Sequence, residues 1–213
     1  MQTQEPIVYQ GQFGSFTIDD HDRQGVLLYR GGLAIAALSF AIATGLVLLQ
    51  NTFWITPLYF VFWTALGVSL FTIHIYVKPL HLALQAFWMI GGLASIALLF
   101  VSSDPMALYV YQHPIWILGT GFTFASLTGI FFKEAFCSDR FETKLLTPIV
   151  PLLLLGHLVG WLPILWEKAL LAAWSALFLV FAIRKLIQPI PPDIGDKSVF
   201  EYLKTTAKSK ATT

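Results

Sequence analysis

The chain has 213 residues, of which 56% are hydrophobic and 12% are charged, and its mean hydropathy is +0.70. A soluble domain carries about 25% charged residues, so the excess apolar side chains must face lipid rather than water. The net charge of +1 argues against a nucleic-acid partner, which needs clustered positive charge, and a single cysteine excludes an intrachain disulfide.

Residues 1–30 precede the first long apolar run and are predicted to form a cytoplasmic segment. They lack the basic start and early apolar core of a signal peptide, so we expect the membrane helices to belong to the mature protein. The stretch from Thr17 to Asp20 is typical of a helix N-cap followed by acids, which predicts a short interfacial helix. The acids at 19, 20 and 22 with His21 could bind a divalent metal, but acids at a helix start are the commoner explanation, and we predict no metal site.

The middle of the chain, residues 31–187, is predicted to be an all-α, polytopic membrane domain. A membrane-spanning helix needs about 20 apolar residues. Six windows meet this length: residues 31–50, 53–77, 80–101, 107–132, 145–166 and 169–187. In the fourth window, His113-Pro114 should divide an interfacial turn from the span proper, because proline favours the first turn of a helix.

The distribution of Lys and Arg predicts the orientation of these six helices. With six spans, all of the 13 basic residues except Lys168 fall on one side of the membrane. Cytoplasmic loops carry such an excess of Lys and Arg. We therefore expect both termini to lie on the cytoplasmic side.

The loop between the fourth and fifth windows carries most of the charge between spans. Its sequence, GIFFKEAFCSDRFETKLLTPIV, predicts a short amphipathic segment at the membrane surface on the basic side. We interpret it as a docking surface rather than a catalytic site. Its candidate partner-binding residues are Lys133, Glu134, Arg140, Glu142 and Lys144.

His74 and His81 flank the turn between the second and third windows. Imidazole is the usual axial ligand of haem, so this pair could ligate haem iron or chlorophyll magnesium. The alternative is that both rings lie at headgroup level and are hydrated.

His157 is predicted to lie about 18 Å deep in the fifth window, at 1.5 Å per residue. There it would need a hydrogen bond, an ion partner or a ligated cofactor. It lies between Gly156 and Gly160, a GxxxG spacing that predicts close packing of another helix. A protease dyad of Ser126 and His157 is disfavoured, because their expected depths of about 10 Å and about 18 Å differ too much for a contact.

Residues 188–213 are predicted to form a Pro-containing cytoplasmic tail. Gln188 to Asp193 should run extended because of its prolines, and a capping box at Ser198 predicts a short helix. Transport of a small solute stays open but is not supported, because the spans contain almost no acid or base and the two halves show no convincing repeat.

The chain resembles a family of uncharacterised integral membrane proteins, a domain of unknown function, of cyanobacteria and plastid-bearing organisms. The resemblance covers about residues 9–204 and rests on the stretches YQGQFGSFTI, SLFTIHIYVKPLH, LYVYQHP, GFTFASLTGIFFKEAFCSDRFETKLLTPIVPLLLLGHLVGWLP and QPIPPDIGDKSVFEYLK. It implies an oxygenic photosynthetic organism and a role tied to its membranes, with the thylakoid favoured over the plasma membrane. The lack of an Arg- and Ser-rich transit peptide favours a cyanobacterial copy. It supplies no reaction and no site.

Together these features predict a non-enzymatic auxiliary factor of the photosynthetic membrane, which assists the assembly, stability or regulation of a pigment–protein complex. Its expected partners are the lipid bilayer and photosystem subunits or other thylakoid proteins. The alternatives are a haem- or chlorophyll-binding protein, through His157 or through His74 and His81, and a small-solute transporter.

Overall fold

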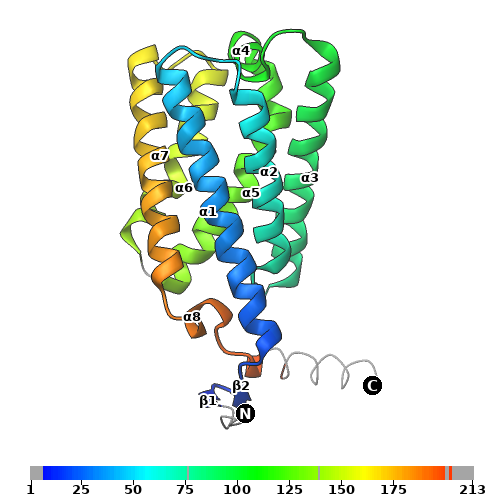
Figure 1. Ribbon diagram of the computed structural model, residues 1–213, viewed down its shortest axis with the longest axis vertical. Helices are drawn as coiled ribbons and strands as arrows, with labels where there is room; N and C mark the ends of the chain where they lie inside the picture. Colours follow the sequence, from blue (N-terminus) through cyan, green and yellow to red (C-terminus); the bar gives the residue numbers. More distant parts are fainter. Residues whose placement is uncertain (1–6, 76, 139, 200–201, 203–213) are drawn as a thin grey trace.

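The computed structural model describes residues 7–75, 77–138, 140–199 and 202, and within these ranges it is an all-α bundle with a small N-terminal hairpin (Figure 1). Six helical segments are long and apolar enough to cross a membrane, which confirms the predicted number of spans. Their helices are α1 (Asp20–Leu48), α2 (Ile55–Thr72), α3 (Lys78–Val101), α5 (Ile117–Ser138), α6 (Phe141–Leu158) and α7 (Ile164–Ile187). The short elements are β1 (Val8–Gly11), β2 (Gly14–Thr17), α4 (Met106–Gln112), the 3-10 helix η1 (Pro114–Trp116) and α8 (Pro191–Ile194).

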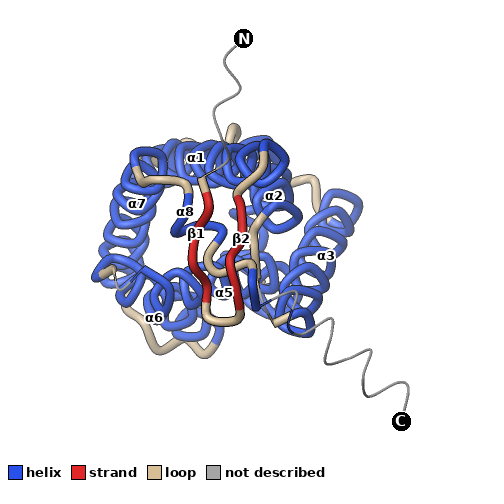
Figure 2. Tube along the Cα trace, turned by 90° about the horizontal axis from the view of Figure 1, so that it is seen from below, coloured by secondary structure: helices blue, strands red, loops and turns tan. Residues whose placement is uncertain are grey.

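The six long helices form a closed ring in the order α1, α2, α3, α5, α6, α7, with α7 packed again on α1. Seen along the bundle, the β-hairpin crosses one end of this ring (Figure 2), and α8 lies between the hairpin and the long helices (Figure 1). We call this the terminal end. The opposite end, which carries α4, is the far end.

Aromatic rings fill the interior of the ring of helices. Phe40 of α1 packs against Phe62 of α2 and Trp174 of α7, with ring centroids 5.8 and 4.5 Å apart. Phe124 of α5 stacks on Phe62 at 5.7 Å. Aromatic pairs of this kind add to the free energy gained by burying the rings, so the middle of the bundle is a packed core.

Two tryptophans join α2 to α3. The indole of Trp63 donates a hydrogen bond to the carbonyl of Trp88 at 3.0 Å, and Trp88 returns the bond to the carbonyl of Trp63 at 2.8 Å. The rings stack at 4.4 Å with planes 4° apart. Each ring lies over a glycine of the other helix, Gly92 and Gly67, where a Cβ atom would come within 2.5 Å of the indole.

The N-terminal segment differs from its prediction. A capping box of Asp19 and Asp22 begins α1, and the helix runs without a break to Leu48, so no separate interfacial helix precedes the span in the described residues. The hairpin occupies the preceding residues instead, with Tyr9 paired to Phe16 and their rings stacked at 5.6 Å.

The remaining differences and agreements between the observed elements and the predicted ones lie at prolines. His113-Pro114 separates α4 from η1 and α5, as the sequence predicts. The tail is not extended throughout, because α8 forms a helical turn that begins at Pro191. The helix predicted from Ser198 extends into residues 200–213, which, apart from Tyr202, lie outside the described residues.

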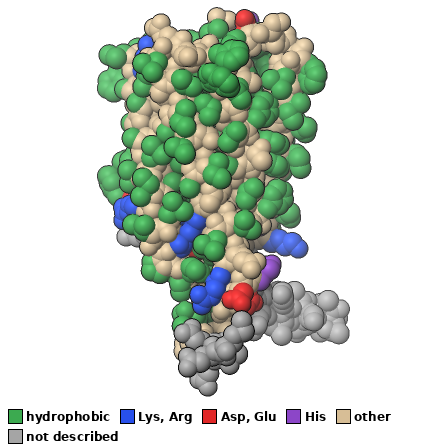
Figure 3. All heavy atoms as spheres, in the orientation of Figure 1, with side chains coloured by type: hydrophobic (Ala, Val, Ile, Leu, Met, Phe, Trp, Pro, Cys, Tyr) green, Lys and Arg blue, Asp and Glu red, His purple; other side chains and the backbone are tan. Residues whose placement is uncertain are grey.

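The outer surface of the bundle carries apolar side chains along its length, whereas Lys and Arg gather toward the terminal end (Figure 3). This agrees with a lipid-facing band bounded by a basic end.

Candidate functional site

A cluster of charged side chains is enclosed at the terminal end of the bundle. Lys185, in the last turn of α7, has no exposed side-chain surface. Its ammonium group donates to Glu134 of α5 at 2.6 Å and makes a second short bond to Asp193 of α8. Burial of an ammonium requires such partners, since the cost of removing it from water is several kcal/mol.

Arg30 of α1 holds the tail onto this cluster. Its Nε donates to Asp193 at 2.7 Å, and its two terminal nitrogens donate to the carbonyls of Gln188 and Pro189 at 2.5 and 2.8 Å. The guanidinium has five donors in a fixed plane, which suits three acceptors on one turn of chain. The tail therefore closes the bundle as an integral part of its structure.

Glu134 accepts from two further groups in the same cluster. The hydroxyl of Tyr29 donates to it at 2.9 Å, and the ammonium of Lys133 donates to the same oxygen at 2.9 Å. Both carboxylate oxygens of Glu134 and of Asp193 thus accept at least one hydrogen bond. A cluster in which each carboxylate oxygen is engaged stabilises the fold, and we assign it a structural role.

The predicted docking residues divide between this interior and the surface. Glu134 and Glu142 are buried, which differs from the solvated loop that the sequence predicts. Glu142 pairs with Arg184 of α7 at 2.8 Å, and Arg140 donates to the side chain of Gln188 at 2.5 Å. Lys144 is exposed.

The hairpin is fastened to the tail beneath the charged cluster. The backbone N–H of Gln12 donates to Asp196 at 2.6 Å, and that of Phe13 donates to Ser198 at 3.0 Å. The Gln12 N–H and the Ser198 hydroxyl hold the pKa of the Asp196 carboxyl below its ordinary value. Lys197 adds an ion pair to Asp22 at 2.6 Å. The hairpin and the tail are therefore joined at the terminal end, and Arg140, just before α6, is bonded to the tail through Gln188. We call residues 7–17, 140 and 188–198 the composite face.

The same contacts account for the acids at the start of α1. Asp19, His21 and Asp22 lie close enough together to suggest a cation site. Asp19 and Asp22 cap the helix, and Lys197 neutralises Asp22. Helix capping and this ion pair explain the cluster without a metal.

His74 and His81 lie near the terminal end, as expected, but each ring has protein partners. His81 Nε2 contacts the Leu70 carbonyl at 2.6 Å and the Gln85 amide at 3.1 Å. His74 Nε2 lies 3.9 Å from Asp22, and burial lowers the pKa of His74. Ligation of haem or chlorophyll through Nε2 of His81 would require the ring to give up these contacts.

His157 lies at the far end and not deep in a span. Helix α6 ends at Leu158, so His157 is in its last turn. Gly160 follows with φ of 67°, and the N–H groups of Gly160 and Trp161 bond to the carbonyls of His157 and Gly156 at 3.0 and 2.9 Å. This is a Schellman ending, in which glycine supplies the left-handed residue.

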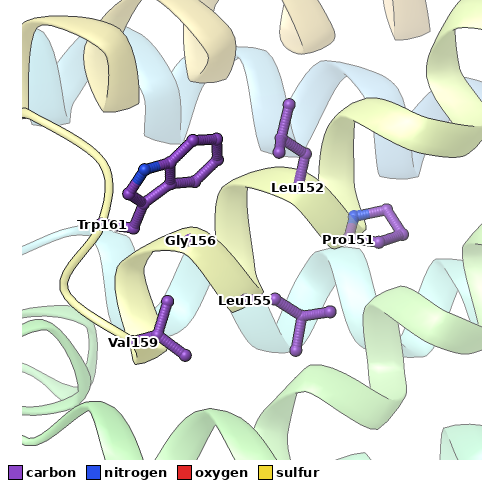
Figure 4. A pocket seen from close by; sticks show the side chains of 6 residues that line it. All are labelled: Pro151, Leu152, Leu155, Gly156, Val159 and Trp161. Carbon is purple, nitrogen blue, oxygen red and sulfur yellow. The ribbon is translucent and has the colours of Figure 1, made fainter.

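The predicted GxxxG crossing is therefore absent at these two positions. A Cβ atom on Gly156 would come within 2.5 Å of Leu162, from the connection after its own helix, and one on Gly160 would meet no atom within 4 Å. The glycines terminate α6 and admit the following loop. An open apolar hollow of about 300 Å³ lies beside Gly156 on the outer face of α6 (Figure 4). It is lined by Pro151, Leu152, Leu155, Gly156, Val159 and Trp161.

Three elements meet at His157. Its Nδ1 lies 2.7 Å from a carboxylate oxygen of Glu167, in the first turn of α7, and its Nε2 lies 3.0 Å from the carbonyl of Tyr111 in α4. The Tyr111 hydroxyl donates to the other oxygen of Glu167 at 3.1 Å, and its ring stacks on His157 at 4.5 Å. Desolvation and this bond to Glu167 raise the pKa of the Tyr111 hydroxyl. Ser126 takes no part, because it donates to the Leu84 carbonyl at 2.9 Å.

A family model described as uncharacterized integral membrane protein (DUF2301) matches residues 68–202. The chain belongs to this family. The match covers well over half of the sequence, and the DUF2301 region includes the charged groups of α5, α7 and α8 together with His157 and Glu167. Arg30 and the hairpin precede it. Neither the curated proteins nor the solved structures gave a match.

The partnership of Arg30, Lys185 and Asp193 was not predicted from the sequence. Arg30 directly precedes the first window, Lys185 lies near the end of the sixth, and Asp193 follows it in the tail, so each was expected at the membrane surface. Asp193 lies 163 residues after Arg30 and 8 residues after Lys185, so no helix or strand periodicity predicts that the three side chains meet. The one available signal was that Arg30 directly precedes a span, because the prolines before Asp193 predict an extended tail and not a turn toward the bundle.

Proposed function

We propose that this integral membrane protein is a non-enzymatic auxiliary factor of the photosynthetic membrane, which assists the assembly, stability or regulation of a pigment–protein complex. The observation that carries the proposal is the composite face at the terminal end, where the hairpin, the tail and the α5–α6 connection are fastened together over a packed bundle. The photosynthetic setting rests on the family resemblance of the sequence.

The interior supports a binding role better than a transport role. Aromatic rings from α1, α2, α5 and α7 fill the middle of the bundle, and the charged cluster closes the terminal end. A solute path through the ring would have to displace both. The scaffold is instead suited to holding its surface in a fixed shape.

The hairpin offers the contact surface. Ile7 and Val8 leave 64% and 59% of their surface exposed, although they belong to the water-facing end of the protein. A two-stranded hairpin also has unpaired strand edges, to which another chain can add. With the basic end in the cytoplasm, as the positive-inside rule predicts, this surface would meet the cytoplasmic (stromal) face of a membrane complex.

The proposal is tested by purifying the tagged protein in mild detergent from a cyanobacterial membrane. We expect photosystem or other pigment–protein subunits to co-purify, and expect Ile7→Ser with Val8→Ser to remove them while the bundle stays folded. Leu49→Ser, at an exposed residue of the far end, is the matched control and should retain them. A colourless protein that runs alone, or a hairpin variant that keeps its partners, would contradict the proposal.

The test avoids the buried charges. Replacing Lys133, Glu134, Arg140 and Glu142 together would remove the docking surface that the sequence predicts, but it would also leave Lys185 without its Glu134 partner. Loss of a complex in that variant would report unfolding as readily as lost docking.

A further inference from the structure

Both ring nitrogens of His157 face oxygen acceptors, so the site needs one more proton than a neutral imidazole beside a carboxylate carries. The Tyr111 carbonyl is an acceptor only, so His157 Nε2 must carry a hydrogen to bond it at 3.0 Å. An ionised Glu167 is also an acceptor only, so Nδ1 must carry a hydrogen to bond it at 2.7 Å. A neutral imidazole has one N–H, and either tautomer would leave a nitrogen lone pair facing an oxygen lone pair.

Two states satisfy both contacts, and they contain the same number of protons. Either His157 is an imidazolium beside a carboxylate, or a protonated Glu167 donates to Nδ1 of a neutral ring. In both, the pair holds one proton more than a carboxylate beside a neutral imidazole. The distance of 2.7 Å is typical of a charge-assisted bond.

The ends of three helices favour the charged form of this pair. His157 is in the last turn of α6, where backbone carbonyls create negative potential, and Glu167 is in the first turn of α7, where N–H groups create positive potential. The Tyr111 carbonyl is in the last turn of α4 and lacks a helical partner for the same reason.

The surrounding titratable groups are few among the described residues. Glu167 and its neighbour Lys168 come from α7, and Lys168 is exposed. Helix α4 contributes Tyr109 and Tyr111. His113, which follows α4, contacts the carbonyl of Tyr109 and stacks on its ring. The charged residues of α6, Glu142 and Lys144, lie at its opposite end.

We propose that His157 and Glu167 form a proton-binding site that latches α4 to α6 and α7 at the far end of the bundle. When the proton is bound, Tyr111 is held through its carbonyl and its hydroxyl. When the proton leaves, one of the two His157 contacts becomes repulsive, which loosens the Tyr111 end of α4, while Met106 at its start stays bonded to Thr56 of α2. The protein thereby senses the proton concentration on the far side of the membrane, through a site separate from the composite face.

The direct test is the protonation of His157 in protein labelled with nitrogen-15 at histidine, with the His157→Gln variant used to identify its signals. When the pH is raised through the range of about 5 to 8 in which histidine side chains can change charge, we expect the two ring N–H signals of the proton-bound pair to be replaced by one. Hydrogen exchange of residues 106–116, corrected for its intrinsic pH dependence, should rise at the same pH. A neutral His157 with one N–H, next to a protected α4 throughout, would overturn the proposal.

The Glu167→Gln variant keeps the contacts of His157 but removes their need for the additional proton. Its amide can donate to Nδ1 while Nε2–H bonds the Tyr111 carbonyl, so a neutral ring satisfies both contacts. We expect α4 to stay protected at every pH in this variant, and His113→Gln, the matched control at the same end, to keep the wild-type response. An unchanged pH response in Glu167→Gln would also overturn the proposal; if the variant does not fold, the nitrogen-15 titration of the wild type decides alone.

Discussion

Both ends of the bundle contain an acid–base contact between helices, but the two are built differently. At the terminal end, Lys185 has two carboxylate partners, and its side chain and that of Glu134 have no exposed surface. At the far end, His157 has one carboxylate partner and leaves 18% of its side chain exposed, next to 12% for Glu167. Enclosure and shared partners hold charges permanently, whereas a single pair in reach of water can exchange a proton.

The largest effect on stability is expected when Lys185, the cation shared by two carboxylates at the terminal end, is replaced. Lys185→Met leaves Glu134 and Asp193 buried without their shared partner. Removal of one member of a buried pair costs about 3–5 kcal/mol, so we expect a large loss of unfolding free energy in detergent. Arg184→Met, at the half-exposed neighbour on the same helix, should cost much less. Equal effects of the two variants would show that burial does not distinguish the positions.

A smaller effect is expected when the tail is released but the cluster keeps its cation. Arg30→Gln removes three hydrogen bonds to the tail, and hydrogen bonds to charged groups contribute about 1.5–3 kcal/mol each, without simple additivity. We expect faster hydrogen exchange and protease cleavage in residues 188–198, with the spans still protected. Arg23→Gln, an exposed position earlier in α1, serves as the control. A tail that stays protected in Arg30→Gln would show that its other contacts, with Lys185, Arg140 and the hairpin, hold it without Arg30.

The smallest effect is expected at the hairpin, where acid should act in the opposite direction to its action at the far end. The pKa of Asp196 is lowered in the folded protein, so its contact with the hairpin contributes above the ordinary carboxyl pKa, near 4, and is lost as the pH falls through the lowered value. Acid should therefore loosen the hairpin, while it closes the proposed latch at the far end. Hydrogen exchange of residues 8–17 measures this, with Asp196→Asn as the variant that should be loose already at neutral pH. If the hairpin stays protected from hydrogen exchange in Asp196→Asn, then Ser198 and Lys197, and not Asp196, hold it to the tail.

Composition and local signals were enough to predict the spans and the presence of a helix start near residue 19. Low charge and long apolar windows predicted six helices, the stretch from Thr17 to Asp20 indicated a helix N-terminus, and His113-Pro114 marked the division before α5. The sequence assigned that N-terminus to a separate interfacial helix, whereas it begins the first span itself. These features depend on neighbouring residues only, which a sequence displays directly.

The candidate sites depended on contacts that local sequence does not contain. Glu134 was predicted to face water because charges usually do at the end of a span, but Lys185, 51 residues later, draws it inward. The depth of His157 was misjudged because an apolar window continues past Gly160 to Trp166. A glycine just after a helix and a proline shortly beyond it are the usual signals of a helix end, and Gly160 with Pro163 indicated the correct boundary.

The reciprocal tryptophans of α2 and α3 give the molecule an optical reporter of its own. Two nearly parallel indoles at 4.4 Å are close enough for their electronic transitions to couple, which makes their ultraviolet circular dichroism sensitive to this packing. The same geometry depends on both hydrogen bonds and on both glycines beneath the rings. Docking of α2 against α3 could thus be followed during membrane insertion without any added label.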